Sequence, residues 1–148
     1  MAWRSCVCGN RIPGRAFVAG VDEEGHPLHV ARGLQGRLLL PGPLDRIQRT
    51  LVVCVNQDQV HVVRDHFDVL MDEEPLRLRW QEVTKGDEMP RDALVVAQYR
   101  RKDEYLGRVT IDGAHYVGRV VGGVCIAVVK FRAESFEKYE VLVLEVDE

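Results

Sequence analysis

The sequence has no long apolar run and no block of like charge. No segment approaches the ~18 continuous apolar residues of a transmembrane helix, which excludes a helical membrane span. Its 20 basic and 23 acidic residues are interspersed and give a net charge of −3, so nothing predicts a nucleic-acid partner. Residues 1–15 lack the apolar core of a secretory signal, and we therefore expect a cytoplasmic chain.

Motifs that carry catalysis are also missing. There is no G-x-S-x-G, H-E-x-x-H, P-loop or G-x-G-x-x-G, and the five histidines are scattered. The four cysteines include one C-x-C pair and no pair of C-x₂-C knuckles, which favours reduced thiols over a zinc site. A Cys–His nucleophilic pair stays open, although nothing favours it. We expect a binding module that is not an enzyme and has no metal or cofactor.

What the sequence does contain is an internal repeat. Six features recur in the same order in both halves, at offsets that fall from 77 to 72 residues. They are Trp3 and Trp80, residues 12–13 and 89–90, 16–18 and 93–95, 28–32 and 104–108, 40–42 and 117–118, and 67–70 and 139–142. Six matches in one order indicate a tandem duplication. We place the repeats at residues 1–75 and 76–148 and expect them to form one structural unit.

The apolar pattern of each repeat indicates β-structure. Residues 51–55 and 124–131 are Val-rich runs that suit buried strands, and a polar break at 56–58 predicts a hairpin. Helical spacing is limited to one or two turns near 44–51 and one near 135–138. The junction at 73–75 is too short for a flexible linker. The predicted fold class is all-β, with two pseudo-symmetric antiparallel repeats packed into one compact domain.

These features resemble the DM-nine repeat, a tandem unit of insect proteins and mollusc plasma lectins that is related to the N-terminal part of natterin-like proteins. The resemblance covers nearly the whole chain. It is carried by Trp3, 9–13, 20–25, 28–32, 40–42 and 67–70 in the first repeat, and by Trp80, 85–90, 105–108, 117–120, 125–128 and 139–142 in the second. It implies interlocked β repeats, possible homodimers, and metal-independent binding of mannose-type glycans in pathogen recognition or defence.

The resemblance also implies where a sugar binds. The family pattern uses the aspartate of a Gly-x-Asp turn and the lysine after Pro-Gly. Asp22 occupies the first place, whereas Pro43 stands where the lysine is expected. In the second repeat Tyr99 falls near the aspartate place and Arg119 takes the lysine place. The predicted carbohydrate-binding residues are therefore Asp22, Tyr99 and Arg119, and the predicted partner is a glycan or glycoprotein.

Simpler interpretations stand beside these. Asp22 can serve as a turn residue whose carboxylate binds its own backbone, and Arg119 as a solvated surface charge. Arg32 and Arg108 are repeated, so we expect them to hold the framework through a carboxylate partner. Trp3 and Trp80 are expected to be packing anchors. The alternative function is a protein–protein interaction or scaffold module that has lost sugar binding.

Overall fold

The computed structural model describes residues 3–72, 76–99 and 101–146 of the chain. Within these ranges the chain forms strands and no helix. The strands are β1 (Trp3–Val7), β2 (Gly20–Val21), β3 (Pro27–Leu28), β4 (Val30–Gln35), β5 (Leu38–Pro43), β6 (Leu51–Cys54), β7 (Val60–Val63), β8 (His66–Leu70), β9 (Leu76–Thr84), β10 (Val95–Tyr99), β11 (Lys102–Ile111), β12 (Ala114–Val121), β13 (Val124–Val129), β14 (Arg132–Phe136) and β15 (Lys138–Val146).

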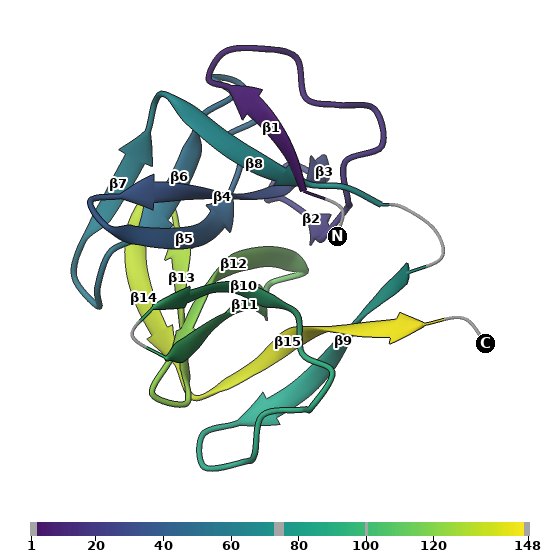
Figure 1. The fold of residues 1–148 in the computed structure, drawn as a ribbon, viewed down its shortest axis with the longest axis vertical. Coiled ribbons are helices and arrows are strands. Elements are labelled where there is room, and N and C mark those ends of the chain that lie inside the picture. The colour runs from purple at the N-terminus through teal and green to yellow at the C-terminus, as the bar shows by residue number, and fades with distance from the viewer. Residues whose placement is uncertain (1–2, 73–75, 100, 147–148) are drawn as a thin grey trace.

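The two halves share one topology, which confirms the predicted fold class. The first forms an antiparallel sheet in the order β1-β8-β4-β5, and the second runs β9-β15-β11-β12-β13-β14. Equivalent residues keep equivalent partners, because Arg32 lies opposite Asp68 and Arg108 lies opposite Glu140. In Figure 1 the first half runs from purple to teal and the second from the teal-green of β9 to the yellow of β15, with β13 of the second half beside β6 of the first.

The halves differ in the connection that follows β5 in the first half and β12 in the second. In the second half this connection is a short turn at residues 122–123, which joins β12 directly to β13, and the sheet continues to β14. In the first half residues 44–50 intervene, and β6 pairs only with β7 apart from a bridge between Leu44 and Leu51. Residues 45–49 form one helical turn, closed by Arg49 N–H donating to the Asp45 carbonyl at 2.7 Å. The expected turn at 135–138 is wrong, because β14 and β15 occupy it.

The core lies within each repeat and also between them. One shared cluster contains equivalent residues of the two halves: Phe17 and Leu94, Ala19 and Val96, Val30 and Leu106, and Leu70 and Leu142. A second joins Val52 and Cys54 of β6 to Ile126 and Val128 of β13. Burying one such side chain contributes roughly 1.5–3 kcal/mol. Because a whole domain is stable by only about 5–15 kcal/mol, neither repeat is expected to fold without the other.

Arg32 connects the first repeat to the second. Its guanidinium lies 4.2 Å from the ring centroid of Trp3. Its Nε donates to Asp68 at 3.2 Å, and its Nη1 donates to the backbone carbonyl of Val96 at 2.5 Å. One side chain therefore stacks on an aromatic ring, pairs with a carboxylate and satisfies a carbonyl of the other repeat.

Arg108 makes the same contacts in the opposite direction. Its guanidinium lies 4.4 Å from the Trp80 ring centroid, and its Nη2 lies 2.8 Å from Glu140. Its Nη1 donates to the carbonyl of Ala19 in the first repeat at 2.7 Å. The two arginines thus form a reciprocal pair of links, each holding a backbone carbonyl of the other repeat.

Two glycines allow strands to approach closely at equivalent places. A Cβ at Gly42 on β5 would lie 1.9 Å from the carbonyl oxygen of Val52, and one at Gly118 on β12 would lie 1.9 Å from that of Ile126. Backbone atoms cannot yield as a flexible side chain can. The shared glycine is therefore a requirement of this close approach and not of a turn.

Candidate functional site

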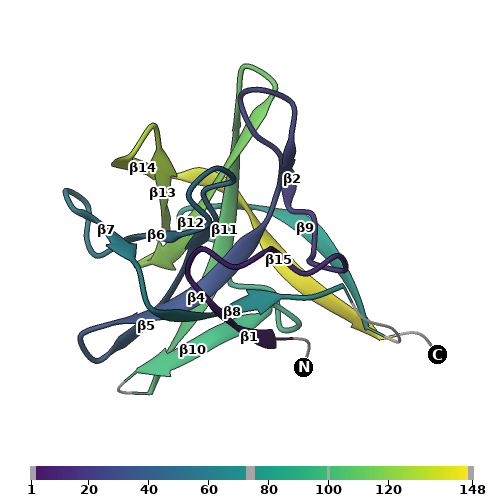
Figure 2. The ribbon, with the colours of Figure 1, turned by 90° about the horizontal axis from the view of Figure 1, so that it is seen from above.

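A groove with a volume of about 380 Å³ lies between the repeats. Its first wall comes from the β2–β3 turn and the segment from β5 to β6, and its second wall from β12 and the β13–β14 turn. Figure 2 shows the β2–β3 turn and the β11–β12 hairpin projecting side by side. The lining side chains are Asp22, Glu23, Glu24, Leu28, Pro43, Leu44, Asp45, Val52, His115, Tyr116, Val128, Lys130 and Phe131.

Asp22 holds the first wall in shape. Its Oδ1 accepts hydrogen bonds from the backbone N–H groups of Glu24 and His26, each at 2.9 Å. Among the described residues no donor bonds to Oδ2, and the side chain is 31% exposed. One carboxylate oxygen therefore fixes the turn while the other is available to a ligand. The two interpretations of Asp22 are compatible.

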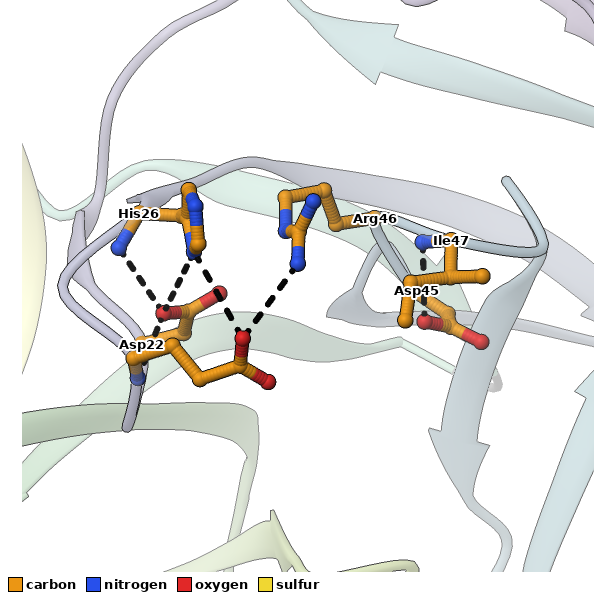
Figure 3. A network of polar contacts seen from close by, with 6 residues as sticks. Asp22, His26, Asp45, Arg46 and Ile47 are labelled. Carbon is orange, nitrogen blue, oxygen red and sulfur yellow. Dashed lines mark hydrogen bonds and ion pairs between the residues drawn. The ribbon is translucent and has the colours of Figure 1, made fainter.

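Other charged side chains surround this turn, as Figure 3 shows. The guanidinium of Arg46 lies 3.5 Å from Glu24 Oε2. The His26 Nδ1 atom lies 3.8 Å from Asp22 Oδ1 and 3.9 Å from Glu24 Oε2, and it is buried without a hydrogen-bond partner in the described structure. The Asp45 carboxylate accepts from Ile47 N–H at 3.2 Å. This wall is acidic, with Arg46 balancing one carboxylate.

Tyr116 and His115 bring the second repeat to the groove. The Tyr116 hydroxyl donates to Glu23 Oε1 at 2.8 Å. Burial is the larger cause, and this hydrogen bond the next, of a pKa of Tyr116 that is raised to about 12. Val21 N–H donates to His115 Nδ1 at 3.0 Å, which requires a neutral imidazole. Burial, and then the charge of Arg108, lower the pKa of His115. Both contacts cross between the repeats.

The β13–β14 turn is unusual for its sequence. Lys130 and Phe131 have φ values of 51° and 63°, and Phe131 is 61% exposed. A two-residue hairpin with positive φ at both positions normally uses Asn or Gly. The neighbouring β12–β13 turn follows this rule with Gly122 and Gly123. A bulky residue in this region is strained by roughly 1–3 kcal/mol, a cost typical of binding sites.

Arg119 lies elsewhere and is not a surface charge. It is 8% exposed, donates through Nε and Nη2 to the Glu104 carboxylate, and donates through Nη1 to the Val55 carbonyl at 2.9 Å. Burial raises the pKa of Glu104, and the arginine partly offsets this. Both residues line a separate hollow of about 660 Å³. The interpretation of Arg119 as solvated is therefore wrong, and the groove that holds Asp22 does not include it.

Tyr99 is at the end of β10, opposite Lys102, and its side chain lies outside the described residues. The sequence interpretation missed Lys130 and Phe131 as groove residues. The one signal in the sequence was Phe131 itself, a large aromatic residue at the end of the Val-rich run at residues 124–131. Within the described ranges no three His, Cys, Asp or Glu side chains are grouped to hold a metal. No described helix is long and apolar enough to cross a bilayer.

Comparisons with known proteins agree with this architecture. The family model described as DM9 repeat, the DM-nine repeat above, matches residues 22–138. No curated protein matches the chain. Its fold is similar to the crystal structure of the nematode sperm cell motility protein MFP2B, with a TM-score of 0.66 and 12% sequence identity. The match covers 99% of this chain and 44% of that one, so this chain spans less than half of that protein.

Proposed function

Because the chain belongs to the DM9 repeat family, we propose that it is a lectin-like module that binds glycans of the mannose type without a metal. Family membership supports a carbohydrate-binding repeat domain at most, so the sugar and the biological role are part of the proposal. The observation that carries it is the inter-repeat groove, where Asp22 offers one unused carboxylate oxygen. We place the protein in the cytoplasm and its role in recognition of foreign glycans.

The chemistry of the groove suits sugar hydroxyls. A carboxylate accepts hydrogen bonds from hydroxyl groups and a lysine ammonium donates them. Lys130 forms no ion pair within the described structure and lines the same groove as Asp22. Pro43 lines this groove as well, so a lysine from the second repeat supplies to the groove the charge that the family pattern places at position 43. The exposed ring of Phe131 offers an apolar face for the sugar ring.

Two substitutions at Asp22 separate recognition from folding. Asp22→Asn keeps an Oδ1 acceptor for the turn and removes the charged oxygen, whereas Asp22→Ala removes both. We expect each to weaken binding of mannose oligosaccharides by about 10-fold or more, because a hydrogen bond to a charged group contributes roughly 1.5–3 kcal/mol. Only Asp22→Ala should also lower the melting temperature. Isothermal titration calorimetry and thermal denaturation measure the two effects.

Asp87→Asn is the matched control. The Asp87 carboxylate accepts from Thr84 N–H at 2.9 Å in a turn that does not line the groove. This variant should bind as the unchanged protein does. A glycan array that gives no binding with folded protein would refute the proposed function.

The second candidate is a protein interaction or scaffold module. The observations that favour it are Pro43 in the lysine place and the burial of Arg119 against Glu104, which leaves neither family position free for a sugar. Pull-down and light scattering test this candidate. A specific protein partner or a stable homodimer, recovered without any glycan affinity, would favour it over the lectin.

A further inference from the structure

The groove continues past Tyr116 into a second hollow. This hollow has a volume of about 400 Å³ and shares Glu23, Tyr116 and Lys130 with the first. It adds Ile111, Asp112, Ala114, Val129 and Glu134. Because three lining residues are common to both, the two hollows adjoin at Glu23, Tyr116 and Lys130 and are treated together as one groove. Each volume exceeds that of a single sugar ring, so the groove has room for at least two sugar units.

The charge along this groove is strongly one-sided. Six carboxylates line the two hollows, namely those of Asp22, Glu23, Glu24, Asp45, Asp112 and Glu134, and the one Lys or Arg among the lining residues is Lys130. Arg46 balances Glu24 from outside. The whole chain carries a net charge of only −3, so the acidic residues are concentrated here well beyond the average. His115, held neutral by the bond from Val21, adds no positive charge.

Tyr116 lies among these carboxylates. Beyond burial and the Glu23 contact, the carboxylates of Asp112 and Glu134 also raise the pKa of its hydroxyl. The phenol therefore stays protonated and neutral, with an aromatic ring in the middle of an acidic groove. Carboxylates together with an aromatic face are the groups that bind a cation in a partly desolvated site.

We propose that the groove is selective for amino sugars, and that its ligand is an oligosaccharide of at least two units carrying free ammonium groups. This inference rests on the proposed function. It keeps the glycan-binding groove and names amino sugars, in place of neutral mannose, as the ligands that the carboxylates of both hollows prefer. The ammonium groups bind to the carboxylates on either side of Tyr116, while hydroxyl groups and ring faces make the contacts described above.

The test compares two ligands with the same sugar rings, one with free amino groups and one with acetylated amino groups. A disaccharide of glucosamine and its N-acetylated counterpart have the same rings, but acetylation removes both ammonium groups. We expect the free amine to bind at least about 10-fold tighter, equivalent to ~1.4 kcal/mol. The difference should shrink at high salt because screening weakens exposed charge pairs. Calorimetry at low and high salt measures both, with the mannose disaccharide as the neutral reference.

Variants of the second hollow sharpen the test. Asp112→Asn keeps a residue that favours positive φ beside Gly113, and Glu134→Gln keeps the size of the side chain. Together they should reduce the preference for the amine about threefold or more, because the affinity for the amine falls further than the affinity for the acetylated sugar. Lys130→Gln should raise the preference, because it removes the one lining cation.

The outcomes separate the two proposals. If no sugar binds the folded protein, the proposed function fails and this inference fails with it. If the acetylated sugar or mannose binds as tightly as the amine, the inference alone is overturned. Ethanolamine is the control for charge without a sugar ring. If it competes at the same concentration as the amino disaccharide, the groove is a general cation site and the inference is also overturned.

Discussion

Equivalent positions in the two repeats carry opposite chemistry. Leu28 and Pro43 of the first repeat are apolar, whereas the equivalent residues of the second repeat, Glu104 and Arg119, form a buried ion pair. Each position lines a hollow between the repeats. The frame of strands, glycines and stacked arginines is common to both. The lesson is that duplication fixed the frame, while the side chains at the hollows diverged.

The largest expected loss of stability comes from breaking the ion pair between Glu104 and Arg119. Arg119→Met leaves the Glu104 carboxylate buried without a partner, which should cost about 3–5 kcal/mol of unfolding free energy. The double variant Glu104→Leu with Arg119→Met imitates the apolar first repeat and should recover most of that loss. Urea denaturation measures both. A double variant as unstable as the single one would contradict the comparison.

The stacked arginines test the symmetry of the frame. Arg32 and Arg108 make matching contacts in the two repeats. The Arg108 side chain is 14% exposed, whereas that of Arg32 is 22% exposed. Substitution by Met keeps the packing length and removes the donors. We expect Arg108→Met to cost about 2–3 kcal/mol and Arg32→Met about 1–2 kcal/mol. Chemical denaturation ranks them, and the reverse order would mean that burial does not set their difference.

A third comparison concerns the two hairpin turns. Replacing Lys130 and Phe131 with Asn-Gly gives the β13–β14 turn the residues that its backbone favours, as in the Gly122-Gly123 turn. The change should stabilise the fold by about 1–2 kcal/mol and weaken glycan binding. Asp112→Asn, in a turn already followed by Gly113, should change stability by less than about 0.5 kcal/mol. A destabilised Asn-Gly variant would show that the Lys-Phe turn carries no strain.

The smallest expected effect is a pH dependence from His115. Its pKa is lowered from 6.5 in the folded chain, so the neutral imidazole stabilises the fold above that value. This contribution is lost as the pH falls from 6.5 through the lowered folded pKa. His115→Asn keeps an acceptor for Val21 N–H and does not titrate. Between about pH 7.5 and 5, the wild-type protein should lose more stability than the variant in denaturant titrations.

The sequence predicts the frame better than the site. The repeat and the Val-rich runs specify strands because their signals are local and recur in both halves. The burial of Arg119 could not be read from the sequence, because its partners Glu104 and Val55 come from two different repeats. Phe131 was missed for another reason: the turn it occupies departs from the residues that normally mark such a turn. The first miss depends on long-range packing, and the second on a local exception to the usual turn residues.

The reciprocal arginine links have a consequence for the origin of the molecule. In a lone first repeat, Arg32 would lack the Val96 carbonyl to which it donates, and the Ala19 carbonyl would lack its donor Arg108. Two copies of one unit, related by a twofold axis, would satisfy both at once. Joining them in a single chain replaces a concentration-dependent association with an intramolecular one. The covalent tandem is thus equivalent to a homodimer that can no longer dissociate, and each half is free to acquire its own ligand preference.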